Sequence, residues 1–144
     1  MKKLLILLLI VSNILSAQDR KIDSLNQIIK TTKNDSIKVD VYNKLTWKYI
    51  FNDEEKSIEL LNRTEKLALK TNQRYGYNTF LTNKGVFFDV HGNSDSAKVY
   101  FEKAIAYSIQ NKFVVQEEYG YNNLGMYSWN NGELQTALNY FFKS

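Results

Sequence analysis

The sequence predicts an all-α fold, a solenoid of helix-turn-helix repeats with a period of about 40 residues. Three observations support this prediction. Residues 78–104 match residues 118–144 at an offset of 40, with seven identities in 27 positions. Within each copy, apolar and small residues recur at spacings of three and four, which places them on one helical face. The chain also has no Pro and no sustained strand alternation, which fits uninterrupted helices.

Composition narrows the function classes before any motif is considered. The chain has 144 residues, no Cys and one His, which excludes a disulfide framework, a thiolate zinc site and a multi-histidine metal site. Apolar residues make up 44% of the chain, which argues against intrinsic disorder. We therefore expect a folded domain that uses no metal and no other cofactor.

The N-terminal segment over residues 1–17 has the layout of a secretory signal peptide. Lys2 and Lys3 form a positive n-region, residues 4–14 form an apolar run, and the small residue Ala17 precedes a polar stretch. The run is about half of the roughly 20 apolar residues that a membrane-spanning helix needs. We predict cleavage after Ala17 and a location outside the cytoplasm, periplasmic or at the cell surface. A buried N-terminal helix and an uncleaved anchor are the alternatives.

Removal of this segment changes the charge balance. The formal charge is +4, from 19 basic and 15 acidic residues. Loss of Lys2 and Lys3 leaves 17 basic residues against 15 acidic ones, a net charge of +2. An excess this small does not suggest a phosphate-binding surface, so we expect this chain to bind no nucleic acid.

The segment over residues 18–34 is predicted to form a leading helix that covers the first of about three repeats, which together span residues 35–144. Apolar side chains lie at helical spacing over 19–32. They are Ile22, Leu25, Ile28 and Ile29.

The first repeat is the weakest copy. Asp35 and Ser36 are candidate N-caps for a helix over 37–51, and Asp53 is a candidate N-cap for the helix that follows. The apolar residues expected on these two helices are Val41, Leu45, Trp47 and Tyr49, then Ile58, Leu61, Leu67 and Ala68. An offset of 39 aligns this copy with the second, so that Thr46 falls on Gly85, Tyr49 on Phe88, Ile58 on Ala97 and Leu61 on Tyr100.

The second and third repeats share a pattern of glycines. The predicted helices are 78–91 and 93–111 in the second repeat, and 118–131 and 133–144 in the third. Gly92 and Gly132 end the first helix of each pair, where a left-handed backbone is least costly. Gly85 and Gly125 recur within the helices, and a mid-helix glycine costs about 1 kcal/mol relative to alanine. Their recurrence indicates that close packing requires them.

A second register competes with the offset of 40. Tyr75-Gly76-Tyr77-Asn78 recurs as Tyr119-Gly120-Tyr121-Asn122 at an offset of 44, which differs by about one helical turn. We prefer 40 because it also aligns the downstream glycines and aromatic residues.

The repeats resemble the tetratricopeptide repeat, a helix-turn-helix unit normally of about 34 residues with the signature W-x₂-L-G-x₂-Y…A-x₃-F. The third repeat offers Tyr121-x₂-Leu124-Gly125, and the second offers Leu81-x₂-Lys84-Gly85-x₂-Phe88. The sequence departs from the signature where Lys84 replaces Leu and Ser128 replaces Tyr, and the closing Pro is absent. The residues assigned to the signature, with a structural role, are Leu45, Gly85, Gly92, Ala97, Phe101, Leu124, Gly125, Gly132, Ala137 and Phe141.

The resemblance implies a concave groove, lined by the first helix of each repeat, that binds a protein or peptide. The groove positions carried over from the family are Asn43, Trp47, Thr82, Val86, Asp89, Asn122, Met126 and Trp129. Packing roles for Trp47 and Trp129 are the alternative. The groove lacks the lysine-rich set that grips a terminal carboxylate, so we expect no such clamp.

The layout as a whole resembles the N-terminal sensory region of bacterial histidine kinases and transcriptional regulators that contain these repeats. The last predicted helix, over 133–144, is clearly shorter than its counterpart over 93–111. We therefore expect the third repeat to be truncated and the chain to be a fragment, with a membrane tether supplied downstream. An exported, non-catalytic binding scaffold is the main hypothesis, and the sensory region of a membrane kinase or regulator is the alternative.

Candidate catalytic groups are few. His91 stands next to Gly92 at a predicted helix end, and no orienting partner for a general base is evident. Adjacent acids such as Glu117 and Glu118 point about 100° apart on a helix, so they do not face a single cleft. We expect no enzymatic activity from these residues.

Overall fold

The computed structural model describes residues 20–144, and all regular secondary structure in this range is helical, which confirms the predicted all-α class. Residues 20–31 are helical. The helices that follow are α2 (Asp35–Tyr49), α3 (Glu54–Thr71), α4 (Arg74–Val90), α5 (Ser94–Asn111), α6 (Val114–Asn130) and α7 (Leu134–Phe141). The predicted signal peptide lies outside the described residues.

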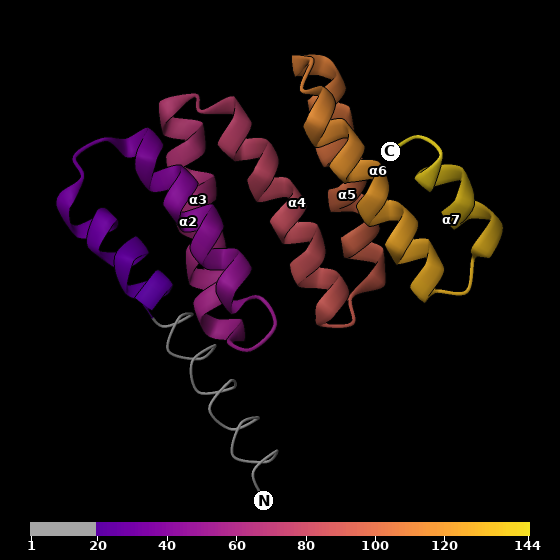
Figure 1. The fold of residues 1–144 in the computed structure, drawn as a ribbon, viewed down its shortest axis with the longest axis horizontal. Coiled ribbons are helices and arrows are strands. Elements are labelled where there is room, and N and C mark those ends of the chain that lie inside the picture. Colours follow the sequence, from indigo (N-terminus) through magenta and orange to yellow (C-terminus); the bar gives the residue numbers. More distant parts are fainter. Residues whose placement is uncertain (1–19) are drawn as a thin grey trace, which may run out of the picture.

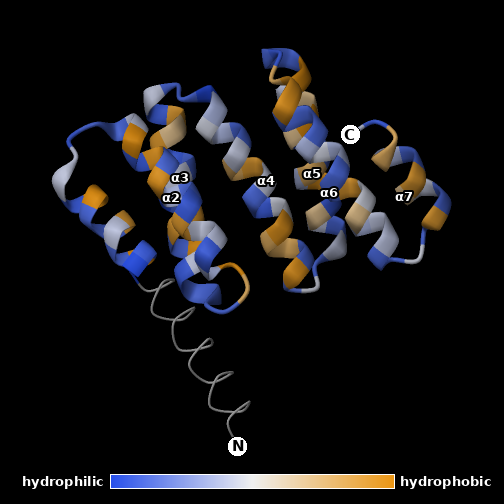
Figure 2. Cartoon of the chain, in the orientation of Figure 1, coloured by the Kyte–Doolittle hydropathy of each residue, from blue (hydrophilic) through white to orange (hydrophobic). Residues whose placement is uncertain are grey.

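From α2 onwards, each helix packs against the next one in the chain, and α4 also contacts both α2 and α6. Figure 1 shows the resulting row of helices, with residues 20–31 at one end and α7 at the other. Each of these helices carries both hydrophobic and hydrophilic residues (Figure 2). Among residues 20–144, no helix combines the length and apolar character that crossing a membrane requires.

From α3 onwards the helix boundaries recur at an offset of 40. α3 and α5 each contain 18 residues and begin at positions 54 and 94. α4 and α6 each contain 17 residues and begin at positions 74 and 114. The left-handed residues Asn72 (φ 51°) and Lys112 (φ 59°), which end α3 and α5, are also 40 apart. The structure therefore follows the register of 40 and not the register of 44.

Three helix starts differ from the sequence prediction. The N-cap of α2 is Asn34 rather than Asp35 or Ser36, because its side-chain oxygen accepts the amide hydrogen of Ser36 at 2.9 Å. Asp53 caps α3 as predicted. α4 and α6 begin four residues before the predicted starts at 78 and 118, because only two residues connect each of them to the preceding helix.

The first hairpin follows two offsets. The N-caps of α2 and α4, Asn34 and Gln73, are 39 apart, whereas Asp53 and Asn93, the N-caps of α3 and α5, are 40 apart. The first hairpin is therefore one residue shorter between these two caps than the second. The predicted offset of 39 between the first and second repeats therefore holds at the start of α2 and is wrong for α3.

This change of offset corrects the expected core of α3. Ile58 does not take the place of Ala97, because Ile58 is 42% exposed while Ser57 is fully buried. Leu61 is buried and lies 40 positions before the buried Phe101, so its predicted match with Tyr100 is also wrong. The Ser57 hydroxyl donates a hydrogen bond to the Asp53 carbonyl at 2.7 Å, which satisfies this buried polar group.

Two helical glycines sit against aromatic rings. A Cβ atom on Gly85 would lie 2.6 Å from the Phe101 ring of α5, and one on Gly125 would lie 2.5 Å from the Phe141 ring of α7. Carbon atoms that are not bonded do not approach this closely. Any residue larger than glycine at either position would therefore displace the aromatic ring. The hairpins α4–α5 and α6–α7 thus close through the same contact.

Two further glycines, Gly76 and Gly120, make close contacts of different kinds. Gly76 of α4 faces Val39 of α2, whereas Gly120 of α6 faces Ile105 of α5, and neither has room for a methyl group. The two glycines therefore occupy different positions within their repeats, which agrees with the helix boundaries in rejecting the offset of 44.

The turn glycines have the predicted backbone geometry. Gly92 and Gly132 adopt φ angles of 75° and 79° in the turns after α4 and α6, in the left-handed region that side chains with a Cβ disfavour. Nothing lies within 4 Å of a Cβ at either position, so backbone conformation and not packing selects glycine there.

The core is continuous along α4, α5 and α6, and a smaller cluster joins the leading helix to the first hairpin. In that cluster the side chains of Ile22, Leu25 and Ile29 pack on Val41, Leu45 and Leu60. The signature residues that are buried are Leu45, Gly85, Ala97, Phe101, Leu124, Gly125 and Ala137.

Lys84, which departs from the repeat signature, is accommodated by its surroundings. Its ammonium group lies 3.6 Å from a carboxylate oxygen of Glu65. The same nitrogen lies 5.2 Å from the centre of the Phe80 ring and 4.9 Å from that of Tyr100. A lysine can therefore replace an apolar residue here, because its alkyl stem packs and its charge meets an acid and two rings.

Candidate functional site

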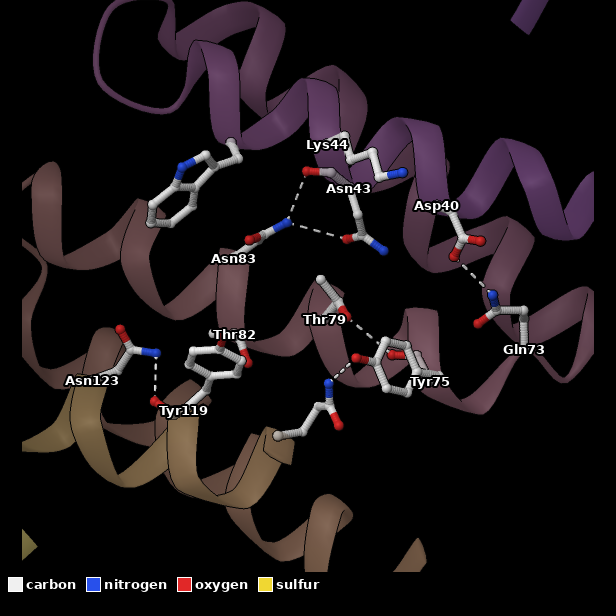
Figure 3. A pocket seen from close by; sticks show the side chains of 12 residues that line it. Asp40, Asn43, Lys44, Gln73, Tyr75, Thr79, Thr82, Asn83, Tyr119 and Asn123 are labelled. Carbon is white, nitrogen blue, oxygen red and sulfur yellow. Dashed lines mark hydrogen bonds between the residues drawn. The ribbon is translucent and has the colours of Figure 1, made fainter. Parts of the chain in front are cut away.

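The alternate helices α2, α4 and α6 line a single pocket of about 620 Å³. Gln73, the N-cap of α4, completes the wall. The lining combines aromatic rings, side-chain amides, two threonine hydroxyls and one charged group of each sign (Figure 3). The residues are Asp40, Asn43, Lys44, Trp47, Gln73, Tyr75, Thr79, Thr82, Asn83, Gln116, Tyr119 and Asn123.

Two asparagines of the pocket lining join α2 to α4. The Asn43 Nδ2 atom donates to the Gly76 carbonyl at 2.9 Å, and Asn83 Nδ2 donates to the carbonyl and Oδ1 of Asn43 at 3.1 and 3.2 Å. A backbone carbonyl can only accept, so these bonds fix which way each amide points. The Oδ1 atom of Asn83 is left on the side away from Asn43 (Figure 3).

Two glutamines connect the pocket helices near their N-terminal ends. Gln73 Nε2 donates to Asp40 Oδ1 of α2 at 2.9 Å. Gln116 of α6 donates to the Tyr75 hydroxyl of α4. Each pair of neighbouring pocket helices is thus held by at least one side-chain hydrogen bond in addition to apolar packing.

Three other polar side chains of the wall donate to their own helices. The hydroxyls of Thr79 and Thr82 donate to the carbonyls four residues before them, at 3.2 and 3.3 Å. Asn123 Nδ2 donates to the Tyr119 carbonyl at 2.8 Å. The two threonines therefore have only oxygen lone pairs left for a ligand, whereas Asn123 keeps its Oδ1 atom and its second Nδ2 hydrogen.

Three aromatic side chains of the pocket are largely exposed: Trp47, Tyr75 and Tyr119. Trp47 packs edge-on against Phe51, with ring centres 5.7 Å apart, and Tyr75 packs against Phe113 at 5.6 Å. These contacts support two of the three rings from outside the pocket while leaving each ring open to a ligand. Exposed aromatic side chains gathered in a concave site are typical of binding surfaces.

The predicted groove residues divide into two groups. Asn43, Trp47 and Thr82 line the pocket. The others lie outside the lining, and these are Val86, which is buried, Asp89, and the exposed Asn122, Met126 and Trp129. Trp129 is 56% exposed, so it is not a core residue, and it does not belong to the pocket lining.

Sequence reasoning missed most of the polar lining. Asn83 and Asn123 were visible as identities at the offset of 40, and a repeated asparagine at a helical core register is the signal that could have selected them. Gln116 had no such signal, because it precedes the predicted start of its helix at 118. Its place in the pocket follows from the earlier start of α6 at Val114.

Two titratable candidates for a functional role, Asp89 and His91, lie outside the pocket lining. Burial raises the pKa of the Asp89 carboxyl above its ordinary value, and no hydrogen bond or ion pair to this carboxylate forms within residues 20–144. His91 follows α4, with Nδ1 2.7 Å from the Phe87 carbonyl and its ring 4.3 Å from the Phe87 ring. In the same range, no group of three His, Asp or Glu side chains is placed to hold a metal ion.

Comparison of the chain with protein-family models, with curated proteins and with solved structures finds no match.

We expect Asp89→Asn to stabilise the fold at neutral pH. The raised pKa means that the folded chain holds this proton more tightly than the unfolded chain does. Stability from this group is present below the ordinary pKa of 3.8 and is lost as pH rises through the folded-state pKa. The free energy of unfolding of the variant minus that of the wild type, measured with urea from about pH 3 to about pH 7, should therefore increase with pH. A difference that stays constant over this range would contradict the assignment.

Proposed function

We propose that this chain is a non-catalytic helical repeat scaffold of the tetratricopeptide type. In this proposal it binds a segment of another protein in the pocket formed by α2, α4 and α6, outside the cytoplasm. The observation that carries the proposal is that pocket, built from the first helices of three successive hairpins.

Kinship with tetratricopeptide repeats is supported by contacts between signature positions. Gly85 meets Phe101 and Gly125 meets Phe141, at the glycine and phenylalanine positions of two successive copies. A chance run of amphipathic helices would not be expected to place the same two residue types in contact in two successive hairpins at one fixed offset. The repeats are longer than the usual unit of the family, which has about 34 residues.

A polypeptide ligand is supported by the chemistry of the wall. Exposed aromatic rings offer apolar contact area, and the amides and hydroxyls offer hydrogen bonds to a main chain. The lining holds a single cation, Lys44, next to the anion Asp40. Nucleic acid is disfavoured because its binding sites need a strong excess of positive charge.

A non-catalytic role is supported by how the polar groups are used. The one carboxylate in the lining, Asp40, accepts a hydrogen bond from Gln73, and the only imidazole, His91, contacts its own helix. Neither group is paired with a nucleophile in the described part of the chain.

We expect binding of a peptide to depend on Trp47 and not on Trp129. Both tryptophans are about half exposed, at 48% and 56%, but only Trp47 lines the pocket. The labelled protein would be applied to an array of random short peptides, and affinities measured for the peptides that bind. Trp47→Ala should weaken binding by about tenfold or more, as for a hot-spot residue, and Trp129→Ala should leave it unchanged. Equal losses in both variants would exclude this pocket as the site.

Export is the part of the proposal that rests on sequence alone, on Lys2, Lys3 and the apolar run that follows them. We expect the mature protein, purified from the compartment outside the cytoplasm, to begin at Gln18. N-terminal sequencing measures this directly. A mature chain that still begins at Met1 and stays in the cytoplasm would refute the proposal of export.

A further inference from the structure

We propose that the pocket of α2, α4 and α6 selects an arginine side chain of the bound segment. This proposal rests on the proposed function and adds the chemistry of the ligand to it. The observation behind it is that oxygen acceptors from α2, α4 and α6 lie in one pocket with three exposed aromatic rings.

Two asparagine amides supply the first of these acceptors. Asn83 is 5% exposed, and its Nδ2 atom is committed to the backbone carbonyl of Asn43. Its Oδ1 atom therefore faces the pocket, where no group among residues 20–144 donates to it. Asn123 donates one Nδ2 hydrogen to the Tyr119 carbonyl of its own helix and adds its Oδ1 atom as an acceptor on α6. The two Oδ1 atoms are thus acceptors that a ligand N–H group can reach.

Other oxygens extend the acceptor surface. The hydroxyl hydrogens of Thr79 and Thr82 are donated to backbone carbonyls, so only their lone pairs remain. Asp40 accepts from Gln73 at one carboxylate oxygen, and its side chain stays exposed at the rim. The wall thus presents acceptors from all three helices to a ligand that carries several donors.

The aromatic rings favour a cationic and planar donor. Trp47, Tyr75 and Tyr119 expose ring faces, and a guanidinium group stacks on such faces and is attracted by them. Its five N–H donors can reach acceptors on more than one helix, whereas the three donors of a lysine ammonium radiate from one atom. A carboxylate has no donors and would leave the pocket oxygens unpaired.

Few groups oppose this assignment. Lys44 is the one cation of the lining, and it is exposed at the rim, where solvent screens its repulsion. The indole N–H of Trp47 and the tyrosine hydroxyls are donors that can bind the main chain of the segment. Since Asp40 and Lys44 cancel in net charge, directed hydrogen bonds and the rings, rather than long-range attraction, would select the ligand.

Fluorescence of Trp47 provides the test. In the full chain carrying Trp129→Phe, Trp47 is the only tryptophan, and it lies in the pocket wall. The probes are capped Gly-Ser peptides with a single central Arg, Lys, citrulline or Glu. We expect affinity to fall in the order Arg, Lys, citrulline, Glu, with Arg at least about tenfold tighter than citrulline because charge-assisted hydrogen bonds are the stronger ones.

Two variants of opposite charge serve as matched controls, since both side chains are exposed and neither substitution disturbs the core. Asp40→Asn should weaken binding of the Arg peptide by about fivefold, and Lys44→Gln should strengthen it, because a cation that repels the guanidinium group is removed. Emission that responds equally to the Arg and Glu peptides would overturn the arginine preference but leave a peptide-binding pocket in place. Emission that responds to none of the four peptides would overturn both this inference and the proposed function.

Discussion

The close approach of α2 and α4 at Gly76 is the contact on which the pocket depends. Val39 of α2 and the side chain of Gln73 fill the space that a side chain at position 76 would take, so the helices can come close enough for Asn43 to reach the Gly76 carbonyl. That bond fixes the Asn43 amide, which in turn receives Asn83. The orientation of the pocket amides therefore follows from the absence of one side chain, and a buried hydrogen bond worth about 1 kcal/mol secures each step.

Hairpin geometry was predictable where the sequence marks it with glycine. Gly85, Gly92, Gly125 and Gly132 report close packing or a left-handed turn, and the register of 40 followed from them. The first hairpin carries no glycine, and there the prediction slipped by one residue and placed Ile58 in the core instead of Ser57. Hydrophobicity alone predicted the wrong buried residue there, because a buried serine can donate its hydroxyl hydrogen to a carbonyl near the start of its own helix.

The pocket was harder to predict because its wall is set by pairs of residues from different helices. Asn43, Trp47 and Thr82 could be named from the helical register, whereas Gln73 and Gln116 enter through the two-residue connections that start α4 and α6 early. Trp129 illustrates the converse, because a residue type suited to binding lies at a position that the pocket does not include. Residue type suggests a ligand-binding surface, and only the placement of helix starts decides which residues share it.

A double-mutant cycle of Gly76→Ala and Val39→Ala tests the central contact most directly, with the free energy of unfolding measured by urea denaturation. Each single variant should lose about 1–3 kcal/mol, one by overpacking and the other by leaving a cavity. In the double variant the clash with Val39 is removed and only the end of the flexible Gln73 side chain must shift, so the losses should not add, and the coupling should reach about 1 kcal/mol or more. The intrinsic helix preference of alanine over glycine cancels in the cycle. Losses that add to within about 0.3 kcal/mol would contradict the account.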